Sequence, residues 1–259
     1  MDSKIKVDIA DFRTETRAWL EENCPKSMCK PIKDASDFYW GGRNAKFSSK
    51  DQKIWFERML EKGWIVPYWE KKYGGGGLSP KENTILTQEM SRLGCPKPNN
   101  SFGISMLGPA LLQFATEEQK LKWLPKLASG GILPTAVFTE PNTGSDLGAL
   151  QTRAELNGNT YQITGNKTWI THGARSDLMT LLARTDPEKN DYSGLSMFLA
   201  EKKRGDDNNP FPTQGMKGSE IEVLGYRGMK EYEIAFDKFS IDKEDLLGGR
   251  ENLGFKQLM

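Results

Sequence analysis

The sequence predicts an α+β protein in which an all-α helical N-terminal part precedes a β-rich part. Apolar residues recur at helical spacing in the first half, and short strand-like runs separated by Gly, Pro, Asn and Asp fill the chain from about Pro134 onward. This order implies two domains, or one body with segregated layers. We expect an N-terminal α-helical domain at 1–133, a middle β-barrel or β-sandwich domain at 134–243, and the start of a third, helical segment at 244–259.

Two helices are expected near the N-terminus. One covers roughly 7–22 and ends before Pro25, and the other covers 49–62 with Gly63 as the glycine just past its end. The apolar residues that set the spacing are Ile9, Phe12, Trp19 and Leu20 in the first helix and Ile54, Trp55, Met59 and Leu60 in the second.

Capping boxes mark two further helix starts. Ser79-Pro80-Lys81-Glu82 combines a Ser N-cap, a Pro at the first helical position and a Glu two residues later, and this helix should stop at Gly94. Thr116-Glu117-Glu118-Gln119 repeats the capping pattern. Residues 101–115 are apolar enough for a buried helix, and Gly74 to Gly77 predict a flexible loop.

The β-rich part contains a clear hairpin signal. Asn157-Gly158 joins the runs Thr152–Leu156 and Thr160–Thr164, and Asn-Gly favours the tight turn of a two-stranded hairpin. Further strand-like runs are Leu178–Ala183, Leu195–Glu201, Ile221–Leu224 and Glu231–Phe236.

The chain stops within an apolar helical pattern. Leu253, Phe255, Leu258 and Met259 follow two glycines, and no cap or basic final turn comes after them. The pattern fits a frayed terminus or a chain truncated before a third segment, and we expect truncation.

Composition excludes several classes of function. The 259 residues carry 36 Lys+Arg against 35 Asp+Glu, so bulk charge does not favour nucleic acid, and no apolar run is long enough to span a membrane. The N-terminus lacks a signal-peptide core, so a cytoplasmic location is expected. Cys24, Cys29 and Cys95 show neither metal spacing nor an even disulfide set, so no metal is expected. His172 is the single histidine, which disfavours His-dependent triads, and we expect it in a surface loop.

Two polar segments are the candidates for chemistry. Ala136 to Asp146 reads AVFTEPNTGSD and holds hydroxyls, carboxylates, a Pro and a Gly at the end of a strand. Gly165 to Gly173 reads GNKTWITHG and sets an aromatic among hydroxyls. Both suit a flat heterocycle, whose edge short hydrogen bonds would fix. The first segment also suits a plain connecting loop, and the second also suits a strand with Trp169 and Ile170 facing the core, so residue types alone leave the choice open.

Together these segments resemble the two signature stretches of the acyl-CoA dehydrogenases. The resemblance spans essentially the whole chain, because further stretches agree in order. They are Tyr73-Gly74-Gly75, Gly108-Pro109-Ala110, Leu182-Ala183-Arg184-Thr185, Gly194 to Leu199, Gly225-Tyr226-Arg227-Gly228-Met229, and Leu246 to Gly249 ahead of Gly254-Phe255-Lys256.

The resemblance implies a fold and a reaction. The family has an N-terminal α-helical domain, a middle β domain and a C-terminal four-helix domain, of which this chain would contain the first two and the opening of the third. The implied cofactor is FAD and the implied substrate an acyl-CoA thioester, as in fatty acid β-oxidation. A carboxylate removes a proton next to the thioester carbonyl, and hydride passes to the flavin N5 to leave a trans-2-enoyl-CoA.

The resemblance also implies roles for individual residues. Phe138 and Thr139 would lie along the flavin ring, Gly144 and Ser145 near its ribityl-pyrophosphate arm, and Ser145 would also meet the acyl-CoA. Trp169 would shield the dimethylbenzene side, and Thr171 would bond near N5. The full cofactor-binding set is Ala136, Val137, Phe138, Thr139, Gly144, Ser145, Trp169, Ile170 and Thr171.

No residue matches the family's catalytic base, which would fall after Met259, so this chain alone is expected to be inactive. Glu140 and Asp146 are expected to be structural. The implied partners are an electron-transfer flavoprotein as electron acceptor and other copies of the chain in a homo-oligomer. Two alternatives stay open: a naturally short, non-catalytic relative that binds acyl-CoA or a partner, and an acyl-CoA oxidase or flavin monooxygenase on the same fold.

Overall fold

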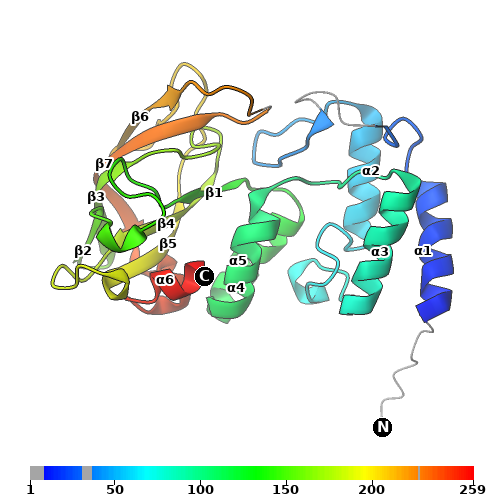
Figure 1. The fold of residues 1–259 in the computed structure, drawn as a ribbon, viewed down its shortest axis with the longest axis horizontal. Helices are drawn as coiled ribbons and strands as arrows, with labels where there is room; N and C mark the ends of the chain where they lie inside the picture. The colour runs from blue at the N-terminus through cyan, green and yellow to red at the C-terminus, as the bar shows by residue number, and fades with distance from the viewer. Residues whose placement is uncertain (1–8, 31–36, 227) are drawn as a thin grey trace, which may run out of the picture. The chain divides into compact units, whose positions relative to one another are not determined.

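The structure is a computed structural model that describes residues 9–30, 37–226 and 228–259. The chain divides into two compact units (Figure 1), the first formed by Met1–Tyr39 with Ala45–Asn100 and the second by Trp40–Asn44 with Ser101–Met259. The predicted order of a helical part before a β-rich part is confirmed. The expected domain boundaries at 133/134 and 243/244 stay predictions. Residues 7 and 8 of the first expected helix, and Arg227, lie outside the described residues.

The first unit is helical. Ser49 caps α2 by accepting from the Gln52 N–H, and the expected capping box of Ser79 and Glu82 starts α3. Gly94 ends α3 with a φ of 71°, a conformation that glycine adopts without steric cost. The helical elements are α1 (Ile9–Asn23), α2 (Lys50–Glu61), the 3₁₀ turn η2 (Lys71–Tyr73) and α3 (Pro80–Leu93).

Helices α1 and α3 pack side by side (Figure 1) and are joined through Glu89. Its buried carboxylate accepts hydrogen bonds from Arg13 (2.7 Å) and Arg17 (2.9 Å) of α1 and from Arg92 of α3 (2.9 Å). The hydrogen bond from Arg17 is the largest contribution that lowers the pKa of Glu89, to about 2. This network fixes the register of the two helices.

The second unit begins with helices and continues into a sheet. The expected helix at 101–115 is a π-helical turn, η3 (Gly103–Leu107), that runs into α4 (Gly108–Phe114). Helix α5 (Glu117–Ala128) starts at the expected capping box of Thr116 and Gln119. The Gln119 amide also reaches the chain after the sheet, because it donates to the carbonyls of Glu244 and Leu246 (2.8 Å each) and accepts from the Gly248 N–H (2.9 Å).

The described residues form a seven-stranded mixed sheet, which confirms the expected β-rich part. Strands β1, β4, β2, β3, β7 and β6 lie in that order, and β5 pairs with β4. β1 and β4 are parallel, and β2 and β3 form the hairpin expected at Asn157-Gly158. The strands are β1 (Pro134–Val137), β2 (Arg153–Asn157), β3 (Thr160–Lys167), β4 (Leu178–Arg184), β5 (Leu195–Glu201), β6 (Met216–Ile221) and β7 (Glu231–Asp242).

One strand expectation was wrong. The run expected at Ile221–Leu224 ends its pairing at its first residue, because Ile221 opposite Glu231 is the last rung between β6 and β7. Val223 and Leu224 lie beyond that rung in an exposed loop. β6 instead covers Met216–Ile221, where exposed polar residues hid the strand from a hydrophobicity pattern.

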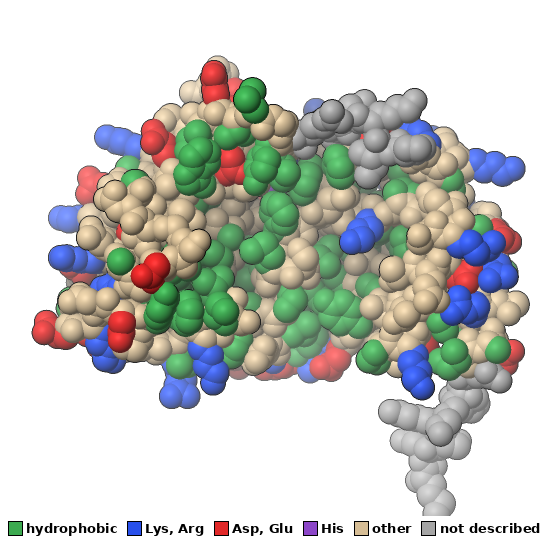
Figure 2. Space-filling view, in the orientation of Figure 1, with side chains coloured by type: hydrophobic (Ala, Val, Ile, Leu, Met, Phe, Trp, Pro, Cys, Tyr) green, Lys and Arg blue, Asp and Glu red, His purple; other side chains and the backbone are tan. Residues whose placement is uncertain are grey.

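After the sheet come short helical elements: η6 (Lys243–Asp245), η7 (Leu247–Gly249) and α6 (Gly254–Leu258), which is the helix expected near the end of the chain. On the face drawn in Figure 2, hydrophobic side chains gather in several groups over the sheet-rich unit, with charged side chains mainly at its rim. No helix among the described residues has the length and apolar character needed to cross a membrane.

Candidate functional site

The two candidate segments lie side by side in the second unit. The first runs out of β1, and the second begins in the last residues of β3 and continues past its end. The Thr168 N–H donates to the Thr139 carbonyl (3.0 Å), and the Lys167 Nζ donates to the Phe138 carbonyl (2.8 Å). The structure therefore brings together the two stretches that the sequence singled out.

The expected cofactor-binding residues differ in what they present. Val137 and Ile170 are buried in the core of the sheet, where they support the segments from within. The other members are at least partly accessible: Ala136, Phe138, Thr139 and Thr171 are half-buried, and Gly144, Ser145 and Trp169 are exposed.

Trp169 is held in the open by a strained backbone. Its side chain is 56% exposed and its φ is 58°, a left-handed conformation that costs a non-glycine residue roughly 1–2 kcal/mol. The next residue locks the turn, because Ile170 and Tyr232 exchange backbone hydrogen bonds of 2.9 and 3.1 Å. Strain in a turn that also exposes a large ring is typical of ligand-binding positions.

A buried ion pair fixes the first segment to the end of β3. Lys167 Nζ lies 3.1 Å from Glu140 Oε1, with side-chain exposures of 0% and 7%. Burial lowers the pKa of Lys167 to about 8. Burial opposes the charge on Glu140 as well, but the Lys167 ammonium and hydrogen bonds from Thr152 and Gln151 lower the pKa of its carboxyl overall. The pair is therefore charged at neutral pH.

Both carboxylates of the first segment hold its loop in shape. Glu140 accepts from the backbone N–H groups of Gln151 and Thr152 (2.8 Å each). Asp146 accepts from the Tyr192 hydroxyl (2.6 Å) and from the Gly148 N–H (3.1 Å). These contacts give both residues the structural role expected for them.

Thr171 is oriented by contacts on both sides. Its hydroxyl donates to Glu231 Oε1 (2.6 Å), and its carbonyl accepts from the Thr135 hydroxyl (2.5 Å). Burial raises the pKa of Glu231, while the hydrogen bond from Thr171 opposes that rise. Glu231 is 3% exposed and begins β7. The hydroxyl of Thr171 thus has a fixed direction.

The expectation that His172 lies in a surface loop was wrong. Its side chain is fully buried, with the rings of Trp40 and Phe102 at centroid distances of 4.7 and 5.7 Å. Arg175 Nε donates to its Nδ1 (3.0 Å). Burial, followed by the charges of Arg175 and Arg204, lowers the pKa of His172 to about 3. The imidazole is therefore neutral and serves packing.

Comparison with known proteins gives the chain a family. The model described as "Acyl-CoA dehydrogenase, middle domain" matches residues 135–239, and "Acyl-CoA dehydrogenase, N-terminal domain" matches 10–131. Together they cover most of the chain. The chain belongs to the acyl-CoA dehydrogenase family. Both candidate segments lie within the match to the middle domain.

Individual relatives agree with this assignment. The chain is 58% identical over 210 residues to (2S)-methylsuccinyl-CoA dehydrogenase of Cereibacter sphaeroides, covering 78% of this chain and 37% of that protein. A solved glutaryl-coenzyme A dehydrogenase in complex with glutaryl-CoA matches with a TM-score of 0.65 at 26% identity, covering 99% of this chain and 60% of that one. A chain from work on the electron transferring flavoprotein of Acidaminococcus fermentans matches with a TM-score of 0.66 at 26% identity, covering 99% and 62%. This chain thus spans between about a third and two thirds of these proteins.

Sequence reasoning missed two residues that shape the site, Lys167 and Glu231. Lys167 looks like an ordinary polar residue near the end of a strand, and its burial depends on Glu140, which comes much earlier in the chain. Glu231 opens a strand, where an exposed carboxylate is common. The alternation of β7 does not signal it, since positions 232, 234 and 236 are buried and Glu231, which is out of phase with them, is buried as well.

Proposed function

We propose that this chain forms the FAD-facing wall of an acyl-CoA dehydrogenase that converts an acyl-CoA thioester to its trans-2-enoyl-CoA. The observation that supports it most is the pairing of the two segments through Thr168 and Thr139, with Trp169 held exposed beside them. FAD, when bound, would accept the hydride in this reaction.

The residues present suit a flat ring with a polar edge and a phosphate-bearing arm. Trp169 offers an exposed aromatic face, and Phe138 and Thr139 are half-buried at the end of β1. A Cβ added to Gly144 would meet nothing within 4 Å, so the exposed loop at Gly144-Ser145 is open to the arm and to the acyl-CoA. We assign contact with the flavin ring to Trp169, Phe138 and Thr139, and contact with the phosphate-bearing arm to Gly144 and Ser145.

Thr171 would bond to the reacting edge of the ring. Because its hydroxyl donates its proton to Glu231, it presents an acceptor oxygen of fixed direction, which would accept a hydrogen bond from a ring N–H of the reduced flavin. We assign Thr171 as the acceptor for that N–H and Glu231 as the residue that positions it.

We assign the proton-abstracting base to neither carboxylate of the first segment. Glu140 is occupied by Lys167 and two backbone N–H groups, and Asp146 by Tyr192 and Gly148. A base must reach the substrate proton, and these groups are directed into their own loop. We propose that the base belongs to a C-terminal domain of the complete protein, and that this chain alone turns over little or no substrate.

We propose methylsuccinyl-CoA, or another short branched or dicarboxylic acyl-CoA, as the substrate. The support is the 58% identity to a (2S)-methylsuccinyl-CoA dehydrogenase. We further propose a homo-oligomer that passes electrons to an electron-transfer flavoprotein in the cytoplasm.

The test uses protein expressed from its complete reading frame. It should purify yellow, and the flavin absorbance should bleach when methylsuccinyl-CoA is added without oxygen. Isovaleryl-CoA and palmitoyl-CoA serve as comparison substrates. Flavin-loaded protein that no acyl-CoA bleaches would refute the proposal, and rapid reoxidation of the reduced flavin by oxygen would favour the oxidase alternative.

A variant links the chemistry to the geometry. Thr171→Ala should slow flavin reduction by roughly 3–10-fold, because the hydroxyl would accept a hydrogen bond from the ring N–H that forms on reduction, and such a bond is worth about 0.5–1.5 kcal/mol. Acyl-CoA affinity should change far less. Thr160→Ala is the matched control, since that hydroxyl donates to the Asn157 carbonyl (3.3 Å) and accepts from the Gln162 side chain (3.4 Å), both within the hairpin. An unchanged reduction rate in Thr171→Ala would remove Thr171 from the mechanism.

A further inference from the structure

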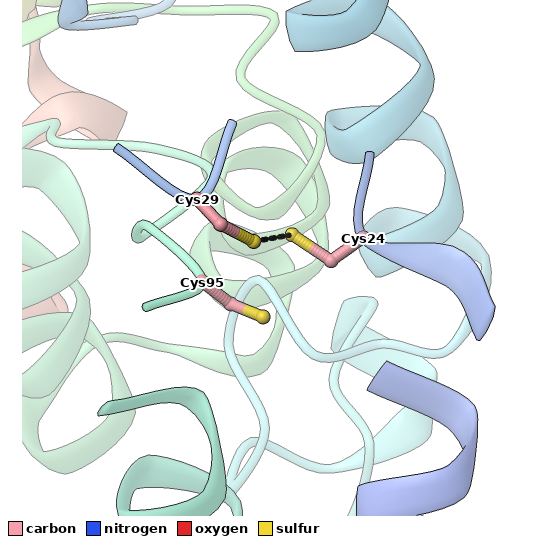
Figure 3. A group of neighbouring side chains, drawn as sticks. All are labelled: Cys24, Cys29 and Cys95. Atoms are coloured by element: carbon pink, nitrogen blue, oxygen red, sulfur yellow. Dashed lines mark hydrogen bonds between the residues drawn. The ribbon is translucent and has the colours of Figure 1, made fainter. Parts of the chain in front are cut away.

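The three cysteines of the chain meet at one end of the first unit. Cys24 follows α1, Cys29 ends the short loop after it, and Cys95 follows α3. Figure 3 shows their sulfur atoms directed into one space, and these atoms all lie within 4.8 Å of one another. The sulfurs of Cys24 and Cys29 are 3.6 Å apart. Spacing along the chain did not predict this, because packing of α1 against α3 brings Cys95 to the other two.

The distances suit a tetrahedral thiolate metal centre. Zinc bonds sulfur at about 2.3 Å, which places sulfur atoms in a tetrahedron roughly 3.8 Å apart. The observed separations therefore need shifts of about an ångström or less to share one ion. Three soft thiolates select zinc over magnesium or calcium, which prefer oxygen ligands.

The cysteine-bearing segments are all fastened to α2. Arg58 Nη1 donates to the Asn23 carbonyl next to Cys24 (2.6 Å), and Trp55 Nε1 donates to the Pro96 carbonyl next to Cys95 (2.9 Å). Ser27 lies two residues before Cys29, and its hydroxyl donates to Asp51 of α2. One helix thus positions all three ligands, and a preorganised ligand set binds metal more tightly than a mobile one.

The electrostatics of this end of the unit also suit a cation. The α1 and α3 helices both end here, and their last carbonyls carry partial negative charge. Three thiolates with a divalent ion leave one negative charge, and the Arg58 guanidinium lies at the same helix end. Cys24 and Cys95 are buried whereas Cys29 is exposed, so an ion has an entry route and a place for a fourth, external ligand.

We propose that Cys24, Cys29 and Cys95 form a zinc-binding site that fastens α1, α3 and the loop at residues 24–29 together. Each thiol that binds loses its proton to solvent, and zinc undergoes no redox change. The site lies in the first unit and takes no part in the proposed dehydrogenation, so it stands apart from that proposal.

The experiment is a metal titration of the purified chain in the presence of a phosphine reductant. Zinc should bind at one ion per chain, and cobalt substitution should give the near-ultraviolet charge-transfer absorption of thiolate ligands. Bound zinc should also slow the reaction of all three thiols with a thiol reagent. These readouts are independent of flavin and of turnover.

Cys29→Ser is the decisive variant, because Cys29 is exposed and its loss should leave the fold intact. It should weaken zinc binding at least about 100-fold. Losing a residue that only hydrogen-bonds a metal ligand typically weakens binding about 10–100-fold, and losing a ligand itself should cost more. Met28→Leu removes a neighbouring sulfur and should bind zinc as the parent chain does. Cys24→Ser and Cys95→Ser should also lose the site, with circular dichroism checking that they fold.

Three results would overturn the proposal. They are no stoichiometric zinc binding, equal zinc affinity in the parent chain and Cys29→Ser, and a Cys24–Cys29 disulfide that forms equally fast with and without zinc.

Discussion

Replacing Lys167 with methionine should destabilise the sheet-rich unit where the segment that follows β1 meets the end of β3. Methionine keeps most of the side-chain volume but removes the ammonium that contacts Glu140 and the Phe138 carbonyl. Glu140 would then be a buried carboxylate without its counter-charge. Breaking a buried pair in this way costs about 3–5 kcal/mol. Glu140 keeps two backbone N–H donors, so we expect a cost near the lower end, about 3 kcal/mol.

The double variant Lys167→Met with Glu140→Gln distinguishes a charge effect from a packing effect. Glutamine buries no charge and keeps an acceptor oxygen for one of the Gln151 and Thr152 N–H groups, but its NH2 group faces the other, so it should recover part of the loss. A cost that came from packing would stay in the double variant.

The measurement is urea unfolding, combined with hydrogen exchange of peptides from β1 and β3, because the two units of the chain can unfold separately. Lys189→Met is the matched control. Its partner Asp186 lies 3.1 Å away in an exposed pair, so the change should be at most about 1 kcal/mol. The reasoning is refuted if Lys167→Met costs no more than Lys189→Met, or if the double variant is no more stable than the single one.

Three further predictions follow from the structure. His172 has a pKa lowered to about 3 from 6.5, so the unfolded chain binds a proton first, and stability should fall as pH drops from 6.5 toward 3. His172→Gln should reduce the slope of unfolding free energy against pH by up to about 1.4 kcal/mol per pH unit. The measurement is urea unfolding of the parent chain and the variant at a series of pH values, and equal slopes would contradict the prediction. Gln119→Ala should cost about 3 kcal/mol, because it loses three hydrogen bonds to the chain after the sheet and the capping-box bond to Thr116. Glu82→Ala loses only the capping-box bond to Ser79 and should cost less in the same unfolding assay. Trp169→Gly should leave stability unchanged or raised, because glycine relieves the left-handed backbone strain. It should weaken FAD binding about 3–10-fold in a fluorescence titration, with the exposed Tyr68→Ala as a neutral control. Undiminished FAD affinity in Trp169→Gly would contradict the assignment.

Elements with local signals could be predicted from the sequence. The capping boxes at Ser79 and Thr116 and the Asn157-Gly158 hairpin depend on residues within a few positions of one another, and all three were found. β6 was misplaced because its pairing with β7 depends on backbone hydrogen bonds, which polar side chains form as well as apolar ones. Hydrophobicity carries little information about such an exposed strand.

The candidate site divides in the same way. Its two segments were recognised from residue types and from family resemblance, but the environment of single side chains was not. His172 beside a glycine and an arginine suggested a surface loop, and its burial depends on Trp40 and Phe102, which precede it by many residues. The grouping of the three cysteines likewise follows from helix packing, which no spacing rule along the chain expresses.

The turn from Lys167 to His172 argues for more than a chain reversal. Lys167 at its start is bound to Glu140, and His172 at its end is enclosed by aromatic rings and Arg175. Between them Ile170 is tied to Tyr232, so the exposed Trp169 has few conformations to choose from. Burying a lysine and a histidine carries a desolvation cost, and a left-handed tryptophan adds strain. A simple connecting turn requires neither the buried Lys167 and His172 nor a left-handed Trp169. A turn that must hold the Trp169 ring and the Thr171 hydroxyl in fixed positions is made rigid by all three.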